Sequence, residues 1–100
     1  ADHGGLQVSY QAFKKATAAN PLPVMDGFTP EQRFFLAYAN VWANNTRPEA
    51  ILQLTKIDVH SLGKWRVDAA LPHIAAWYEA FGITEKDPMY VPVAERVSIW

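Results

Sequence analysis

Helix-start signals followed by apolar stripes constrain this sequence more than any other feature. The clearest begins at Thr29, which is suited to cap a helix, with Pro30 at the first helical position and Gln32 placed to return the cap's hydrogen bond. The apolar residues that follow recur at the helical spacing i, i+3, i+4 and i+7: Phe35, Tyr38, Ala39 and Trp42. This pattern predicts a helix that is buried along the stripe and ends at the Asn-Asn pair 44–45.

Similar signals predict three further helices. The first covers residues 6–19 and ends at an Asn-Pro pair, because the position before a proline disfavours the helical conformation. Another begins at a second capping-box motif, residues 46–49 (Thr-Arg-Pro-Glu), and fades near Lys56. The last follows Pro72 and stops at Gly82. Its stripe again has the spacing of one helical face: Ile74, Trp77, Tyr78 and Phe81.

The remaining segments complete an all-α prediction. A loop over residues 58–63, in which Gly63 permits a tight bend, leads to a helical turn over residues 66–70. The tail from Thr84 onward is predicted to be extended and packed down, because it is rich in apolar side chains: Met89, Tyr90, Val97, Ile99 and Trp100. No segment alternates as a strand does, so we expect about four helices and an extended C-terminal tail. The aromatic residues expected in the core are Phe34, Phe35, Trp77, Tyr78, Phe81 and Trp100.

The charge balance and the rarity of metal ligands exclude several functions. Nine basic and ten acidic residues give a net charge of −1, and Lys14-Lys15 is the only adjacent basic pair, which argues against a nucleic-acid-binding domain. No apolar run approaches the ~18–20 residues needed to cross a bilayer. The absence of cysteine excludes disulfides and thiolate metal sites, and the three histidines form no His-x-x-x-His pair. Taken alone, the residues leave open a stand-alone, non-catalytic helical interaction module.

Three segments together carry a resemblance to a known family. They are residues 1–5 (Ala-Asp-His-Gly-Gly), residues 34–49 with their Phe-Phe-Leu, Val-Trp and Arg-Pro-Glu groups, and residues 58–66 (Asp-Val-His-Ser-x-Gly-x-x-Arg). With Met89 and the terminal Trp100, they resemble the C-terminal end of the neprilysin family of zinc metallopeptidases. That family includes the endothelin-converting enzymes and bacterial oligopeptidases. The resemblance covers essentially the whole chain.

The resemblance implies a zinc metalloendopeptidase that cleaves peptides before hydrophobic residues. Residues 1–100 would form the C-terminal part of its larger, mainly helical zincin-like catalytic domain, without the His-Glu-x-x-His helix. The third zinc ligand of the family, a Glu, would lie three residues before Ala1. The whole enzyme is therefore expected to need zinc. This chain is expected to hold none and to be inactive alone.

The resemblance also assigns roles to three polar residues, each with a structural alternative. Asp2 would accept a hydrogen bond from a zinc-ligand His, or would be a carboxylate favoured by a helix start. His60 would stabilise the oxyanion of the tetrahedral intermediate, or would be a loop histidine bonded to backbone. Arg66 would contact a substrate carbonyl, or would form a surface ion pair with Asp58 or Asp68.

Val41 and Trp42 resemble residues that line the pocket for the side chain after the scissile bond, with plain core packing as the alternative. His3 and His73 are interpreted as structural or solvated. The implied partners are peptide substrates and the N-terminal remainder of the catalytic domain. We also expect a homodimer through an apolar face around Leu6, Val41 and Trp42, which the zinc-binding helix would cover in the whole enzyme.

Source and location follow from the resemblance only in outline. Vertebrate members have cysteines near Ile83 and Val97, where this chain has apolar residues, so packing is expected to replace the covalent link and a bacterial source is favoured. The family suggests a periplasmic or cell-surface enzyme, with a cytoplasmic one left open.

Overall fold

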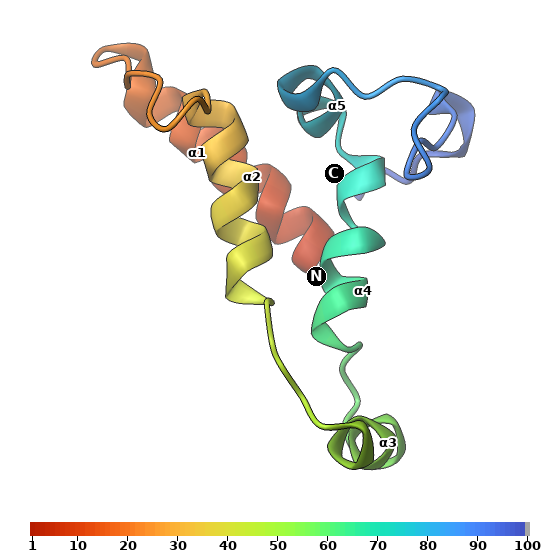
Figure 1. The fold of residues 1–100 in the computed structure, drawn as a ribbon. Coiled ribbons are helices and arrows are strands. Elements are labelled where there is room, and N and C mark those ends of the chain that lie inside the picture. Colours follow the sequence, from red (N-terminus) through yellow and green to blue (C-terminus); the bar gives the residue numbers. More distant parts are fainter. Residues whose placement is uncertain (100) are drawn as a thin grey trace.

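The structure, a computed structural model, describes residues 1–99, and Figure 1 shows that range as an arrangement of helices. The only strand-like pairing in residues 1–99 is an isolated bridge between Met25 and Phe28. The predicted all-α class is confirmed, while Trp100 and its predicted place in the core lie outside the described residues. The elements in chain order are α1 (Asp2–Ala18), α2 (Pro30–Val41), α3 (Pro48–Ile57), α4 (Gly63–Asp68), the 3-10 turn η1 (Leu71–His73), α5 (Ala75–Phe81) and the 3-10 turn η2 (Val93–Glu95).

The hydrophobic core lies where α1, α2 and α5 meet. Phe35 of α2 is at its centre, with 1% of its surface exposed. Burying a side chain of this kind contributes ~1.5–3 kcal/mol. The other buried members of the cluster are Leu6, Leu71, Ile74, Trp77 and Tyr78. The predicted core aromatics Phe34 and Phe81 are partly buried against it. The stripes of α2 and α5 are therefore buried, as their spacing predicted, and the structure adds that they pack against each other.

The two predicted capping boxes have opposite outcomes. At α2 the box is confirmed: Thr29 Oγ1 accepts from the Gln32 backbone N–H at 3.2 Å, and the Gln32 side chain accepts from the Thr29 N–H at 2.9 Å. At α3 the predicted box is wrong, because Arg47 is the N-cap and no side chain caps the helix. Pro48 occupies the first helical position and holds Arg47 extended, which leaves Thr46 one residue too far out.

Two helices begin earlier than predicted. α1 starts at Asp2 and runs through the Gly-Gly pair, since burial of His3 and Leu6 offsets the low helix propensity of glycine. α4 starts at Gly63, so Gly63 is helical and does not serve as a bend. A Cβ atom on Gly63 would lie 2.7 Å from the Trp42 carbonyl oxygen. The glycine is therefore required by the close approach of α4 to the end of α2.

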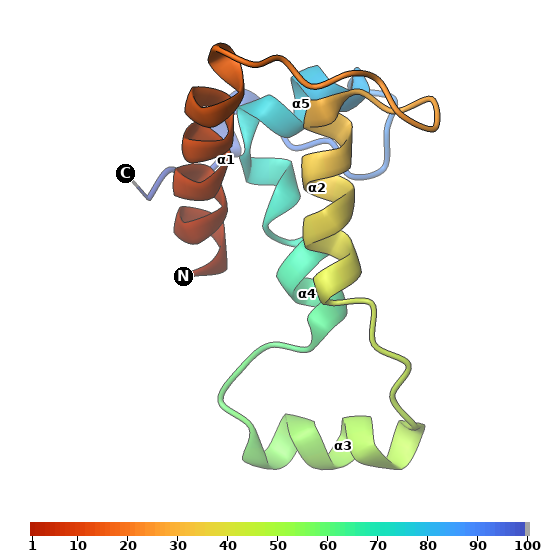
Figure 2. The same ribbon diagram turned by 90° about the vertical axis from the view of Figure 1, so that its left-hand side faces the viewer.

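Helix α3 stands apart from the rest of the molecule. Figures 1 and 2 show it connected to α2 and α4 by two extended segments. None of its residues is buried, and Leu52 and Ile57 are 60% and 69% exposed. The radius of gyration is 15.3 Å, against about 13 Å for a compact chain of this length. The projecting α3 gives the chain this extended shape.

The C-terminal tail is only partly packed down. Met89 and Tyr90 lie against the core, and the Tyr78 hydroxyl accepts from the Val91 N–H at 2.9 Å. Val97 and Ile99, however, are 54% and 42% exposed, so their predicted burial is wrong within this chain. The periodicity of the tail could not reveal this, because an apolar side chain does not indicate which surface covers it.

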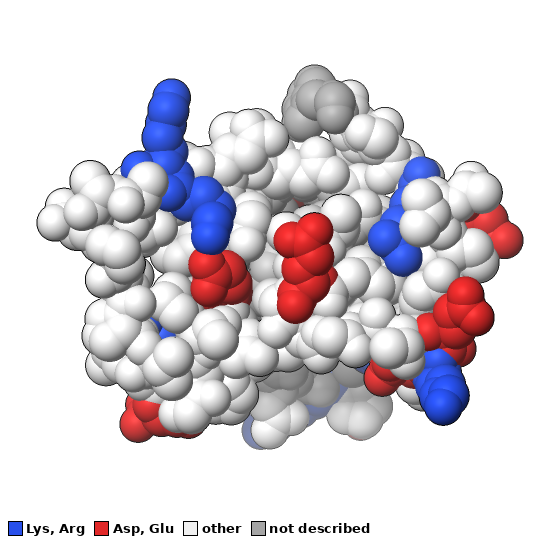
Figure 3. Space-filling model, turned by 90° about the horizontal axis from the view of Figure 1, so that it is seen from above, with Lys and Arg blue, Asp and Glu red and all other residues white. Residues whose placement is uncertain are grey.

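The surface carries no broad patch of one charge on the face shown in Figure 3, where Lys and Arg side chains lie among Asp and Glu side chains. This agrees with the near-zero net charge. Within residues 1–99, no helix is both long enough and apolar enough to span a membrane.

Candidate functional site

A two-bond ion pair joins α4 to the first turn of α1. Arg66 Nε donates to Asp2 Oδ2 at 2.6 Å, and Arg66 Nη2 donates to Asp2 Oδ1 at 2.8 Å. The two residues are 64 positions apart. Their side chains are 21% and 30% exposed, so the pair is largely shielded from solvent. The two parallel bonds fix the plane of the guanidinium group.

Two aromatic residues, one in α2 and one directly after its last residue, complete the surroundings of Arg66. Its guanidinium carbon lies 3.8 Å from the centroid of the Trp42 ring. The Tyr38 hydroxyl donates to the Arg66 carbonyl oxygen at 2.7 Å. Asp2, Tyr38 and Trp42 therefore hold both the side chain and the backbone of Arg66. We call these three residues and Arg66 the arginine cluster.

The contact between Asp2 and Arg66 favours the ionised form of both side chains. The hydrogen bonds from Arg66 lower the pKa of Asp2, although its partial burial acts in the opposite direction. The same hydrogen bonds raise the pKa of Arg66. Both groups are therefore ionised at neutral pH. Burial is the main cause that raises the pKa of Tyr38, so its hydroxyl remains a donor.

His60 lies in the loop before α4 and is much less constrained. Its side chain is 65% exposed. Asp58 Oδ1 accepts from the His60 backbone N–H at 2.9 Å and from the ring Nδ1 at 2.8 Å. A carboxylate can only accept, so Nδ1 carries a proton and Nε2 is the ring atom left for another partner. These two bonds are the main causes that lower the pKa of Asp58.

The ion pairs with Asp58 or Asp68, the structural alternative for Arg66, are both absent from the described residues. Asp58 binds His60 instead, and Asp68 pairs with Lys64 one helical turn away. No local signal could have identified Asp2 as the partner, because the contact depends on how α1 and α4 pack. Tyr38 was also missed as a polar contributor, since its place in the apolar stripe indicated only core packing.

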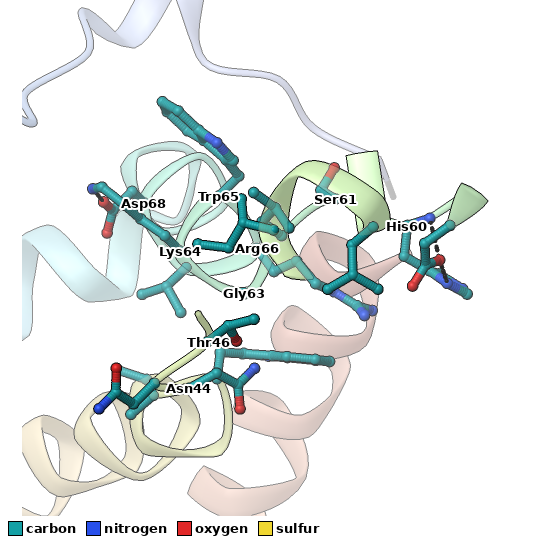
Figure 4. Close-up of a pocket in the computed structure, with 18 residues that line it drawn as sticks. Asn44, Thr46, His60, Ser61, Gly63, Lys64, Trp65, Arg66 and Asp68 are labelled. Carbon is teal, nitrogen blue, oxygen red and sulfur yellow. Dashed lines mark hydrogen bonds and ion pairs between the residues drawn. The ribbon is translucent and has the colours of Figure 1, made fainter. Parts of the chain in front are cut away.

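Arg66, His60 and Trp42 line one cavity of about 650 Å³ between the end of α2, α3 and α4. Figure 4 shows Arg66 reaching out from α4, with His60 on the loop beyond it. Val41 lies elsewhere: it lines a second hollow of about 430 Å³ together with Asp2. The structure therefore brings His60, Arg66 and Trp42 to one cavity and directs Val41 to its neighbour.

The predicted apolar face is wrong at Leu6 and correct at Val41. Leu6 is 5% exposed and belongs to the core of this chain, whereas Val41 is 68% exposed. Leu6 is covered because the early start of α1 places it against α2 and α5. The homodimer predicted through this face stays a prediction.

The residues present do not fit a zinc site. Within residues 1–99, no three His, Cys, Asp or Glu residues are grouped to bind a metal ion. His3 and His73 approach each other, with ring centroids 5.9 Å apart, but each has its own structural partner. His3 Nε2 is 3.0 Å from the Gln7 amide nitrogen, and His73 Nδ1 accepts from the Val97 N–H. Burial is the main cause that lowers the pKa of His3.

Known proteins match the chain over nearly its whole length. Human membrane metallo-endopeptidase-like 1 is 39% identical and human neprilysin 35% identical, each over all of this chain. The zinc metalloprotease Zmp1 of Mycobacterium tuberculosis, solved in complex with an inhibitor, has a TM-score of 0.92 and 33% identity over 99% of this chain. The chain spans only 13%, 14% and 15% of the lengths of these three proteins. Residues 1–97 match the model of Peptidase family M13, and with these identities across the chain we conclude that it belongs to that family.

Proposed function

We propose that this chain supplies part of the active-site wall of a zinc metalloendopeptidase, while residues outside it hold the zinc. The proposal rests on membership of Peptidase family M13 and on relatives named as metallo-endopeptidases and as a zinc metalloprotease. The observation that carries it is the placement of Arg66 and His60 on one cavity. Of the two, Arg66 is rigidly held and His60 is accessible.

Arg66 is suited to bind the backbone of a peptide. A guanidinium has five N–H donors in a fixed fork, and Asp2 occupies one on Nε and one on Nη2. The donors on the opposite edge, including both on Nη1, point away from Asp2 and can reach a carbonyl oxygen of the substrate. Because Asp2 and Trp42 fix the guanidinium beforehand, little conformational entropy is lost on binding.

His60 is suited to stabilise negative charge that develops on the scissile carbonyl. Its Nδ1 is held by Asp58, which leaves Nε2 to face a substrate oxygen. Donation from Nε2 requires the protonated ring, and the Asp58 carboxylate is placed to balance that charge. Preorganised donors of this type contribute about 3–4 kcal/mol to transition-state stabilisation in other enzymes.

The remaining roles are carried over from the family resemblance. Each oxygen of Asp2 has a lone pair beyond the one that Arg66 uses, so Asp2 could also accept from a zinc-ligand His. Val41 and Trp42 would contact the hydrophobic side chain that follows the scissile bond. We also infer a location outside the cytoplasm, consistent with a relative named as a membrane enzyme.

The proposal is tested with the full-length gene product. Peptides that differ only in the residue after the intended cleavage point are incubated with the enzyme before and after zinc chelation. We expect cleavage before Phe or Leu, its loss on chelation and its recovery when zinc is returned. Chelator-resistant cleavage, or no cleavage by zinc-loaded protein, would contradict the proposal.

One observation favours a second candidate, a non-catalytic interaction module. The exposed apolar side chains of α3 need a partner, and a separate protein would serve as well as the N-terminal remainder of a catalytic domain. The same measurement separates the two candidates: an interaction module would show no peptidase activity in the full-length gene product.

A further inference from the structure

Trp42 contacts Arg66 in a way that a pocket-wall role does not require. The Arg66 guanidinium carbon is 3.8 Å from the centroid of the indole ring, well within the ~6 Å over which a ring face attracts a cation. Asp2 meanwhile occupies an edge of the same guanidinium through Nε and Nη2. The ring face and the carboxylate therefore restrain the group from two directions, and the Arg66 side chain is 21% exposed.

The backbone fixes Trp42 relative to Arg66. Tyr38 of α2, one turn before Trp42, donates its hydroxyl proton to the Arg66 carbonyl oxygen at 2.7 Å. Gly63, one turn before Arg66 on α4, lies so close to the Trp42 carbonyl that even a Cβ atom would meet it at 2.7 Å. The end of α2 and the start of α4 are thus held together on both sides of the indole–guanidinium contact.

We propose that Trp42 is a positioning residue for Arg66. Together with Asp2, its ring face holds the guanidinium so that the donors left over from Asp2 meet a peptide carbonyl. The inference rests on the proposed function of Arg66. A pocket wall would act on one substrate side chain, whereas a positioning residue acts on the substrate backbone, which every peptide presents.

A double-mutant cycle in the full-length peptidase separates these roles. Trp42→Leu and Arg66→Ala are made singly and together and assayed on two peptides that differ only in Phe or Ala after the scissile bond. We expect Trp42→Leu to raise KM by about 3- to 10-fold on both peptides. On the Ala peptide, which offers no large side chain to a pocket wall, it should raise KM no further in the Arg66→Ala background, because the group it positions is gone. A rise confined to the Phe peptide, or equal in both backgrounds, would overturn the inference.

Two further variants control for lost packing. Trp42→Phe keeps an aromatic face and should raise KM less than Trp42→Leu. Trp65→Leu makes the same change next to Arg66, at a 57% exposed tryptophan whose ring faces Lys64. Its effect, whatever its size, should add to that of Arg66→Ala without coupling. Equal coupling of Trp65→Leu would overturn the inference.

The failure of each idea gives a different result. If Arg66→Ala leaves KM unchanged, the proposed function of Arg66 is wrong and the inference falls with it. If Arg66→Ala raises KM but Trp42→Leu retains its full effect in that background, only the inference is wrong. Should Trp42→Leu not fold, Trp42→Phe carries the same test, since its smaller rise in KM on the Ala peptide must disappear once Arg66 is Ala.

Discussion

The arginine cluster and the His60 loop border the same cavity but differ in what holds them. Arg66 is 21% exposed and is restrained by Asp2, Tyr38 and Trp42 from two other helices. The His60 side chain is 65% exposed, and its backbone N–H and ring Nδ1 both bond to Asp58, two residues away. The packing of this chain therefore preorganises Arg66, whereas His60 depends on its own loop. We expect the first to act in binding and the second to act when charge develops.

The largest effect is expected at His60. In the full-length enzyme, His60→Ala should lower kcat by about 100-fold or more with little change in KM, because it removes a donor used mainly in the transition state. Steady-state kinetics checks this. Val59→Ala is the matched control, since Val59 is 94% exposed in the same loop and lines neither cavity. A loss of similar size in Val59→Ala would assign the effect to loop structure.

Arg66 should give the complementary result. Arg66→Ala is expected to raise KM about 10-fold or more, the cost of losing a charge-assisted hydrogen bond to substrate. Arg66→Lys should recover only part of this, because an ammonium cannot bond Asp2 and a carbonyl with the same planar fork. Initial-rate measurements over a range of peptide concentrations test both variants. If Arg66→Lys restored the wild-type KM, the positive charge alone, without the planar fork, would account for substrate binding.

Gly63→Ala should weaken the positioning of Arg66, because it moves α4. The added Cβ meets the Trp42 carbonyl, so α4 must shift away from α2. We expect destabilisation of about 1–3 kcal/mol and a rise in KM smaller than that of Arg66→Ala. Thermal unfolding and kinetics of the same preparation would show this. Unchanged stability would indicate that α4 does not rest on α2.

The smallest effect concerns pH. Because Arg66 lowers the pKa of Asp2 in the folded state, the pair stabilises the fold above the unfolded-state pKa of about 3.9 and loses this contribution as pH falls through the lower, folded-state value. Because solvent still reaches both side chains, we expect this contribution to the free energy of unfolding to be small. Denaturant unfolding of wild type and Asp2→Asn should differ at pH 6 and converge near pH 2. A difference that persists at pH 2 would point to a packing effect.

The sequence predicted what depends on neighbours along the chain. Thr29, Pro30 and Gln32 specify the start of α2 within four positions, and that start was correct. The capping box predicted at Thr46 was wrong although its sequence matches the motif, because Pro48 makes Arg47 the N-cap. Gly63 was identified as special for the wrong reason: its value is the close approach to Trp42 and not a bend.

What depends on distant packing was not predictable from the pattern. The resemblance selected Asp2 and Arg66 separately, but nothing in the sequence joined two residues 64 positions apart. The sequence pattern also did not predict that part of the C-terminal tail is exposed, for a related reason. Val97 and Ile99 are apolar, as a covered residue would be, but no surface of residues 1–99 covers them fully.

The central claim, that the two regions act at different stages, is tested most directly by binding. Calorimetry would compare a substrate-like peptide with an analogue that carries a tetrahedral phosphorus centre in place of the scissile carbonyl, using wild type, His60→Ala and Arg66→Ala of the full-length enzyme. The account predicts that His60→Ala weakens only the tetrahedral analogue, whereas Arg66→Ala weakens both ligands by a similar factor. If both variants weakened both ligands alike, His60 and Arg66 would share one role and the account would be wrong.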